Sequence, residues 1–135
     1  MAKKLNLKII TPQKVLLEEE VDAVYSTSTD GQFGILPDHI SYMTPLDIGV
    51  TEYTKDNKKE FISTIGGILQ VKDNVVTILS DLAEFGEQID VARANAAKER
   101  AETRLRTGAT DVDADRAHAA LSRAVARIHA ASKTM

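Results

Sequence analysis

The stretch of sequence that decides the fold is Phe61-Ile62-Ser63-Thr64-Ile65-Gly66-Gly67-Ile68-Leu69-Gln70-Val71-Lys72-Asp73-Asn74-Val75-Val76-Thr77-Ile78-Leu79. It contains three short runs of β-branched and aliphatic residues, separated by Gly66-Gly67 and by Lys72-Asp73-Asn74. Such runs, punctuated by Gly, Asp and Asn, are typical of consecutive strands joined by tight turns. The stretch therefore predicts three successive strands.

The sequence before this stretch has the same character. Apolar and polar residues alternate over residues 5–9, and residues 15–17 and 21–25 form two more short apolar runs. None of these segments keeps a helical period over three turns. Many short strands at regular spacing predict a β-sandwich or a barrel. About 85 residues are enough to bury one modest core.

The composition changes near residue 86, and the rest of the chain has a helical character. Residues 90–106 contain no Gly or Pro and are rich in Ala, which favours a helix. Gly108 suits a helix C-terminus, and Thr110 with Asp113 resembles a capping box at the start of a second helix. This helix is expected to end near Ala131. Because the connection is short, we expect an antiparallel hairpin over residues 87–135, following a β-domain over residues 1–86.

Charge is divided unequally between the two parts. The chain has 17 Lys and Arg against 20 Asp and Glu, a formal net charge of -3. Residues 1–86 hold 8 basic and 13 acidic residues, whereas residues 87–135 hold 9 and 7. All seven arginines lie in the second part: Arg93, Arg100, Arg104, Arg106, Arg116, Arg123 and Arg127. Because the guanidinium fork suits phosphate and carboxylate, this segregation indicates an anionic partner; drift in composition is the alternative.

Composition and motifs exclude several classes of protein. A net charge of -3 argues against a uniformly basic nucleic-acid binder, and the absence of Cys excludes disulfides and thiolate metal sites. No apolar run approaches the roughly 20 residues that span a bilayer, and the N-terminus lacks the apolar stretch of a signal peptide. We therefore expect a soluble, intracellular protein that reaches a membrane only through a protein partner.

No credible catalytic constellation is visible. The chain lacks a Gly-rich phosphate loop and a dinucleotide fingerprint. Its three histidines, His39, His118 and His129, have no metal-ligand spacing. We expect a protein that is not an enzyme on its own and holds no metal.

The apolar stripes of the two expected helices are thin. They consist mostly of Ala: Val91, Ala94, Ala101 and Leu105 on the first helix, and Ala117, Leu121, Ala124, Val125 and Ile128 on the second. Burying an Ala methyl contributes far less than the ~1.5–3 kcal/mol of a buried Leu or Ile. A hairpin with high helix propensity and weak adhesion is typical of a movable element. Permanent packing on the β-domain is the alternative.

The charged faces of these helices carry paired arginines. Arg100 with Arg104, and Arg123 with Arg127, are i,i+4 pairs of like charge that repel each other. A polyphosphate ligand or an acidic partner would supply the missing counter-charge. A merely solvated face is the alternative.

Three motifs resemble the epsilon subunits of F-type ATP synthases. Residues 31–39 with 44–46 resemble the Gly-x-x-Gly-Ile-Leu-Pro-x-His loop of that family, and residues 66–71 resemble its Gly-Gly-aromatic-x-Glu-Val strand. Residues 89–94 resemble its Ile/Leu-Asp-x-x-Arg-Ala nucleotide motif. The resemblance covers residues 4–132 in the order of the family.

The resemblance implies a ten-stranded β-sandwich followed by two helices, seated as a rotor component between the gamma shaft and the membrane c-ring. The residues it places against gamma and the ring are Gly31, Gln32, Phe33, His39 and Thr44. Gln32 stands where the family often has Glu, so a charge contact with the ring does not carry over to it. Ile68 and Gln70 also depart from the family's aromatic residue and Glu.

The resemblance also implies a switch. The hairpin lies folded on the sandwich while the enzyme turns over, and it extends along gamma to acidic segments of the alpha/beta head when ATP hydrolysis is inhibited. ATP is the implied regulatory ligand of the folded form, with no cofactor required and the part of Mg²⁺ left open. The implied ATP site is Glu84, Asp90, Arg93, Ala94, Arg100, Arg123 and Arg127. The implied location is the cytoplasmic face of the bacterial cell membrane.

Two other functions remain open from the residues. One is a free-standing nucleotide-sensing module, which would lack a large partner surface around residues 31–39. The other is a rotor subunit whose hairpin is a static scaffold and does not sense ATP.

Overall fold

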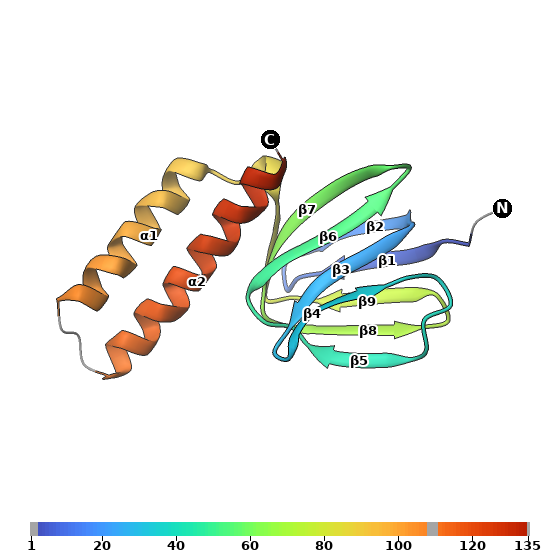
Figure 1. Ribbon diagram of the computed structural model, residues 1–135, viewed down its shortest axis with the longest axis horizontal. Coiled ribbons are helices and arrows are strands. Elements are labelled where there is room, and N and C mark those ends of the chain that lie inside the picture. The colour runs from blue at the N-terminus through green and yellow to red at the C-terminus, as the bar shows by residue number, and fades with distance from the viewer. Residues whose placement is uncertain (1–2, 108–110, 135) are drawn as a thin grey trace.

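The chain folds into two bodies, a β-sandwich and a pair of antiparallel helices that lies against one side of it (Figure 1). The structure is a computed structural model that describes residues 3–107 and 111–134, with side chains from residue 114 onward in the second segment. Ten strands form two five-stranded sheets, followed by two α-helices. The predicted sandwich and hairpin are confirmed, and the barrel is excluded.

The first sheet, sheet A, has the strand order β2-β1-β9-β8-β5. Its strands are β1 (Leu5–Ile10), β2 (Val15–Val21), β5 (Tyr42–Pro45), β8 (Ile68–Lys72) and β9 (Val75–Leu79). β1 and β9 are parallel, and the other neighbours are antiparallel. The parallel pair joins the N-terminal strand to a strand about 70 residues later, which no local pattern predicts.

The second sheet, sheet B, is antiparallel throughout, with the order β10-β7-β6-β3-β4. Its strands are β3 (Ala23–Ser28), β4 (Gly31–Ile35), β6 (Gly49–Lys55), β7 (Lys58–Ile65) and β10 (Leu82–Phe85). The predicted run 21–25 is divided between two sheets, because Asp22 separates the end of β2 from the start of β3. The prediction of a loop over residues 31–39 is wrong for residues 31–35, which form β4 and pair with β3.

The core of the sandwich lies between the two sheets. Inward-facing Leu, Ile and Val side chains fill it, and the largest that are fully buried are Leu5, Leu7, Ile9, Ile35, Ile62, Leu69 and Ile78. Their period-2 spacing within each strand is the alternation visible in the sequence. Burial raises the pKa of Tyr53, at one end of this core, to about 12.

Two tight turns and one close backbone approach fix the strand pairing. Asp56-Asn57 and Asp73-Asn74 have positive φ values, as two-residue hairpin turns between twisted strands require. Gly67 has a φ of 110°, and a Cβ there would lie under 3.0 Å from the Leu79 carbonyl oxygen. The turn signals in the sequence therefore correspond to real turns between β7, β8 and β9.

The helical part begins with a short 3-10 helix, η1 (Gly86–Gln88), followed by α1 (Val91–Arg106) and α2 (Asp111–Thr134). Asp90 is the N-cap of α1 rather than its first residue, because its side chain accepts a hydrogen bond from the Arg93 backbone N–H at 3.0 Å. α2 extends three residues beyond the predicted end at Ala131. The expected roles of Gly108, Thr110 and Asp113 at the helix ends lie outside the described residues and side chains.

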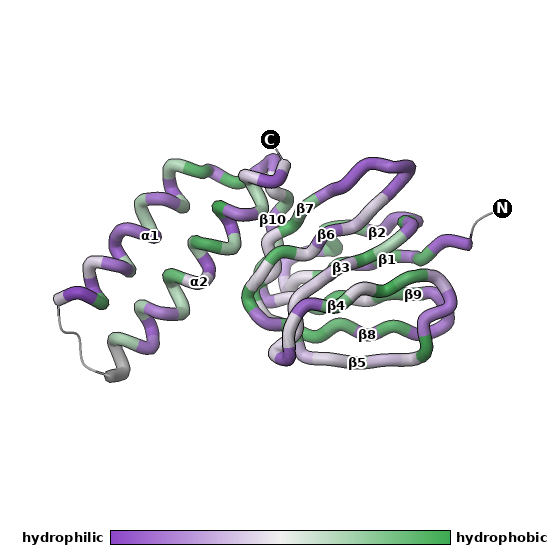
Figure 2. Tube along the Cα trace, in the orientation of Figure 1, coloured by the Kyte–Doolittle hydropathy of each residue, from purple (hydrophilic) through white to green (hydrophobic). Residues whose placement is uncertain are grey.

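The two helices meet along a seam of alanines. The buried side chains of this seam are Ala94, Ala101, Ala117, Ala124 and Ala131, with Val91, Leu105, Leu121 and Ile128 only partly buried. Hydrophilic and apolar residues alternate along both helices, as the colours of Figure 2 show. The predicted thin apolar stripes are therefore confirmed.

α2, rather than α1, makes the main contacts with the sandwich. It packs on the outer face of sheet B, against β7, β6 and η1, and its C-terminal end lies beside the start of the hairpin (Figure 1). Val50 and Ile128 pack there against a small cluster of Ile89, Ala94 and Ala130. The outer face of sheet A is left uncovered by the helices.

Candidate functional site

A groove of about 340 Å³ lies between α1 and α2, and we call it the arginine groove. Its lining consists of alanines and arginines only: Ala97, Arg100, Ala101, Arg104, Ala120, Arg123, Ala124 and Arg127. The alanines keep the two helices close and leave space between the longer side chains. Residues one helical turn apart share a face, which is why each helix contributes an i,i+4 pair of arginines.

The charges in the arginine groove are poorly compensated. Among the side chains that the structure describes, Arg127 alone of the four arginines has a carboxylate within ion-pair distance, that of Glu84. Arg100 and Arg104 are exposed, whereas Arg123 and Arg127 are half-buried. Guanidinium groups bind phosphate in bidentate pairs, so four of them facing one groove form a site for a multiply charged anion.

Glu84 connects the groove to the sandwich. Its Oε1 lies 2.8 Å from Arg127 Nε, and both atoms are buried. The N–H does not point along the line to the carboxylate, so the contact is an ion pair and not an aligned hydrogen bond. The cross-strand neighbour of Glu84, Ser63, has a buried hydroxyl that finds no partner among the described residues.

The other predicted ATP-site residues lie at the start of α1. Asp90 and Arg93 are exposed, and Ala94 is 2% exposed in the small apolar cluster under α2. Asp90 contacts the backbone of Arg93, so the structure does not show it orienting the guanidinium. The rise of an α-helix puts Arg93 roughly 10 Å before Arg100 along the axis. These three residues do not line the arginine groove.

The structure thus brings together Arg100, Arg123 and Arg127, with Glu84 bound to the last of them. It adds Arg104, which the predicted site omitted. The signal was present in the sequence, because Arg104 follows Arg100 by four residues and must share its face.

The residues predicted to contact partners lie on β4 and on the chain that follows it. Gly31 and Gln32 are exposed, and Phe33 and His39 are half-buried. The rings of Phe33 and His39 both approach Tyr42, at centroid distances of 6.1 and 5.9 Å. Four of the five predicted contact residues are therefore at or near the surface.

Thr44 is the exception. Its residue is 4% exposed, on the inner side of β5 opposite Leu69. Its side chain does not lie on the expected contact surface, because the alternation of the strand turns it inward. Met43, 62% exposed, occupies the outward position beside it.

The segment around His39 is held by polar contacts at the end of the sandwich. The Asp38 N–H donates to Asn74 Oδ1 at 2.6 Å, and Lys3 Nζ lies 2.9 Å from Asp38 Oδ2. Hydrogen bonds from Lys3 and then Asn74 hold the pKa of Asp38 below its usual 3.8. Asp38 has a φ of 66°, so this segment has a defined backbone shape.

The uncovered face of sheet A carries an apolar row that the sequence did not predict. One outward residue from each strand takes part, in cross-strand register: Val15, Ile10, Leu79, Ile68 and Pro45. Val15, Leu79 and Ile68 are 54%, 50% and 45% exposed. An exposed apolar row across a whole sheet is typical of a protein-binding surface. We call it the sheet A row.

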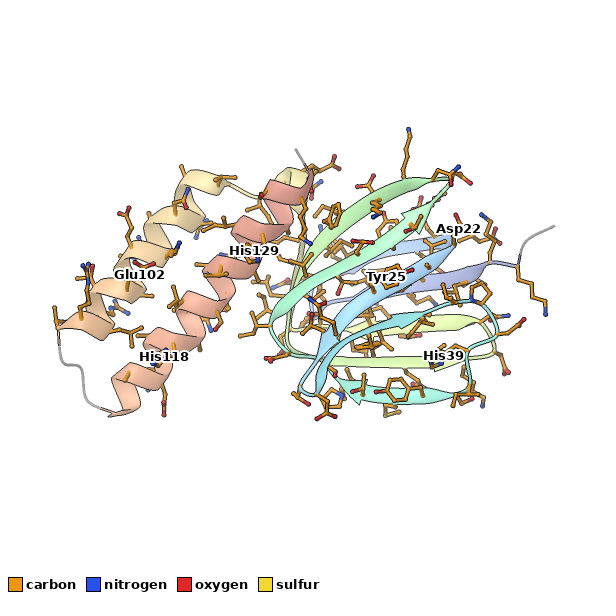
Figure 3. The ribbon with its side chains drawn as sticks, viewed as in Figure 1. Asp22, Tyr25, His39, Glu102, His118 and His129 are labelled. Carbon is orange, nitrogen blue, oxygen red and sulfur yellow. The ribbon has the colours of Figure 1, made fainter. Side chains whose placement is uncertain are left out.

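Other kinds of site receive no support from the described residues. His39 lies in the sandwich, whereas His118 and His129 lie apart on α2 (Figure 3). In the part of the chain that the structure describes, no group of three or more His, Cys, Asp and Glu side chains could hold a metal ion. No helix among the described residues is long and apolar enough to cross a membrane.

Two family profiles match the chain in succession. Residues 4–86 match the profile described as ATP synthase, Delta/Epsilon chain, beta-sandwich domain. Residues 87–132 match the profile described as ATP synthase, Delta/Epsilon chain, long alpha-helix domain.

Relatives of similar length carry one name. A protein of Desulfitobacterium hafniense named ATP synthase epsilon chain is 48% identical over 97% of this chain and 98% of its own length. A protein of Nitratidesulfovibrio vulgaris with the same name is 45% identical over 95% of this chain and 96% of its own.

Solved structures share the fold. A chain in the Euglena gracilis mitochondrial ATP synthase (OSCP/F1/c-ring) matches with a TM-score of 0.84 and 24% identity, over 95% of this chain and 81% of that chain. A chain in the Tetrahymena thermophila mitochondrial ATP synthase (central stalk/c-ring) matches with a TM-score of 0.56 and 17% identity, over 76% and 92%. With both profiles and the near-full-length relatives, the chain belongs to the ATP synthase delta/epsilon chain family.

Proposed function

We propose that the chain is a non-catalytic rotor subunit of an F-type ATP synthase. ATP keeps its hairpin folded on the sandwich, and the chain inhibits ATP hydrolysis when the hairpin is released. The observation that carries the proposal is the arginine groove, with four guanidinium groups and, among the described side chains, one carboxylate within ion-pair distance. A free-standing sensor or a static scaffold would not need both this groove and an open apolar sheet face.

The sandwich is the proposed coupling part. The sheet A row offers exposed aliphatic side chains from all five strands, which suits a hydrophobic partner surface such as the gamma shaft. The segment from Gly31 to His39 also belongs to the sandwich and is the proposed contact with the c-ring. The two structural neighbours come from assemblies described as F1/c-ring and central stalk/c-ring, which agrees with these partners. The complex would sit at the cytoplasmic face of the bacterial membrane.

The hairpin is the proposed sensor. A triphosphate in the arginine groove would contact arginines of both helices, so it would bridge α1 and α2. Arg93, about two turns before Arg100, and Asp90 at the N-cap of α1 would then lie toward the nucleoside end of the ligand. Arg127 would keep Glu84 as a second partner, which ties the occupied groove to β10.

A bound nucleotide is sufficient to decide between hairpin states of similar free energy. A ligand that binds only the folded state stabilises it by about 2.7 kcal/mol at a concentration one hundred times its Kd. The alanine seam buries little apolar area, so a stabilisation of this size shifts the equilibrium strongly. When ATP falls, the freed arginine faces become available to acidic segments of the alpha/beta head.

Calorimetric titration of the full chain with ATP, with and without Mg²⁺, tests the sensor. We expect saturable binding at micromolar to low-millimolar ATP, and at least a tenfold loss of affinity for Arg123→Ala combined with Arg127→Ala, because each charge-assisted contact to phosphate contributes about 1.5–3 kcal/mol. Arg106→Ala is the matched control, because Arg106 is exposed on α1 outside the groove. Unchanged affinity in the double variant would refute the site.

Two further measurements separate the alternatives. Co-purification with gamma distinguishes a rotor subunit from a free-standing module. For a rotor subunit it should be lost in Leu79→Asp and kept in Tyr25→Asp, which changes a residue of sheet B. Deletion of residues 87–135 distinguishes a regulator from a scaffold, since ATP hydrolysis by the complex rises in the first case and stays the same in the second.

A further inference from the structure

Gly86 lies where the sandwich ends and the hairpin begins. It opens η1, directly after β10, and it is buried beneath the last turns of α2. The C-terminal end of α2 lies against this segment in Figure 1. The C-terminal end of α1 and the N-terminal end of α2 lie on the side of the helix pair remote from the sandwich (Figure 1).

A side chain at position 86 has no room in this arrangement. A Cβ on Gly86 would lie under 3.0 Å from Thr134 Oγ1 and from the carbonyl carbon and oxygen of Ala130. The Thr134 hydroxyl donates to that same carbonyl oxygen at 2.7 Å, so the two crowding groups hold each other in place. Two of the three obstructing atoms belong to the backbone of α2 and cannot move aside without moving the helix.

The backbone of Gly86 does not itself require glycine. Among the described glycines, those with positive φ are Gly31, Gly66 and Gly67, and Gly86 is not one of them. It has a 3-10 helical conformation that any residue adopts, and Ala is preferred to Gly in helical backbone. The three atoms nearest to such a Cβ all belong to α2, so the need for glycine at this position arises from the docked position of α2.

The contact lies at the C-terminal end of α2, beside two other contacts between hairpin and sandwich. Glu84, two residues before Gly86, pairs with Arg127, and Ile89, three residues after it, packs with Ala130 and Ala94. α1 reaches the sandwich chiefly through α2. Separating the last turns of α2 from residues 84–89 therefore removes one of the main contacts that hold the hairpin on the sandwich, besides those with β7 and β6.

We propose that Gly86 is the docking latch of the hairpin: the absence of a side chain at this position permits the folded-back state, and any side chain there shifts the chain toward the released state. The inference rests on the proposed function in that the hairpin has a released state. It adds the residue that sets the balance between the two states without touching ATP or a partner.

Gly86→Ala in the full chain tests the latch. The chain has no Cys, so spin labels on cysteines replacing the exposed Asn95 of α1 and Lys72 of β8 report one distance. Without nucleotide, we expect a second, longer distance between the labels. The ratio of released to docked chains should rise about 5- to 150-fold, the range for overpacking a tight contact. Gln88→Ala, an exposed position in the same 3-10 helix, should leave the distance distribution unchanged.

Two additions keep the outcome decisive. Hydrogen exchange of the β1 amides reports whether the sandwich stays folded in the variant. If Gly86→Ala unfolds it, Ala130→Leu approaches the same contact from the α2 side, because Ala130 is fully buried there. A folded Gly86→Ala chain that keeps the docked distance overturns the latch, and so does a folded Ala130→Leu chain that keeps it.

The latch and the sensor can fail separately. If Gly86→Ala releases the hairpin but the chain binds no ATP, the latch proposal is supported and the sensor proposal is refuted. If the chain binds ATP through Arg123 and Arg127 but its hairpin stays docked in Gly86→Ala, the sensor proposal is supported and the latch proposal is refuted.

Discussion

The sandwich and the hairpin bury different kinds of side chain. The core between the sheets is built from Leu, Ile and Val, many of them fully buried. In the described part of the helices, every fully buried side chain is Ala. A buried Leu or Ile contributes about 1.5–3 kcal/mol, and an Ala far less. One chain therefore contains a body that stays folded and an appendage whose attachment depends on a few contacts, which is what a fixed rotor contact joined to a movable sensor requires.

The largest effect is expected in the sandwich. Ile62→Ala removes a fully buried side chain from the centre of β7 and should lower the free energy of unfolding by about 2–5 kcal/mol. Chemical denaturation followed by circular dichroism measures this loss. Ile40→Ala, at a position 79% exposed, should change it by less than about 0.5 kcal/mol. Equal losses of unfolding free energy in Ile62→Ala and Ile40→Ala would show that the core between the two sheets does not stabilise the sandwich.

An intermediate effect is expected in the alanine seam. Ala124→Leu inserts three carbons where α2 meets α1 and should destabilise the hairpin by about 1–3 kcal/mol through overpacking. Hydrogen exchange should show faster exchange in α1 and unchanged protection in β1. Ala96→Leu, on the exposed side of α1, should slow exchange or leave it unchanged. Loss of protection in both bodies would mean that they unfold together and that the comparison is wrong.

The smallest effect concerns a half-buried ion pair at the end of the sandwich remote from the helices, where Figure 3 places Asp22. The hydrogen bond with Lys4 lowers the pKa of Asp22 below 3.8 and raises that of Lys4 above 10.5. The stabilisation is complete between these values. It is lost as the pH falls through the lowered pKa or rises through the raised one.

Asp22→Asn should therefore reduce the free energy of unfolding between about pH 5 and pH 9, with the difference from the unchanged chain narrowing at both extremes. Denaturation at a series of pH values measures it, with the exposed Asp30→Asn as the matched control. A difference that grows toward acid pH would contradict the assignment. Helix protection should not respond at any pH.

Much of the molecule could be read from local patterns. The turns at Gly66-Gly67 and Asp73-Asn74, the strands beside them and the helical hairpin follow from short-range chemistry, which a sequence shows directly. The pairing of Arg100 with Arg104, and of Arg123 with Arg127, follows from helical spacing. The groove that unites the two pairs needed only the further prediction that the helices are antiparallel.

The errors lie where distant segments meet. Thr44 was expected at the surface because its motif matched, but the register of β5 against β8 turns it inward. Residues 31–35 were expected as a loop, because they match the first part of the family's loop motif, but pairing with β3 makes them a strand. Both outcomes depend on partners far along the chain.

The sequence by itself determined the three strands within residues 61–79, the helical hairpin, how the seven arginines segregate and how thin the apolar face of the hairpin is, because these properties depend on neighbours within a few residues. Only the tertiary structure decided the sheet A row, the ion pair between Glu84 and Arg127, and the requirement for glycine at position 86. The β1–β9 pairing within the row, the ion pair and the contact at Gly86 join segments that are 43 to 69 residues apart in the sequence, and no local pattern encodes such separations.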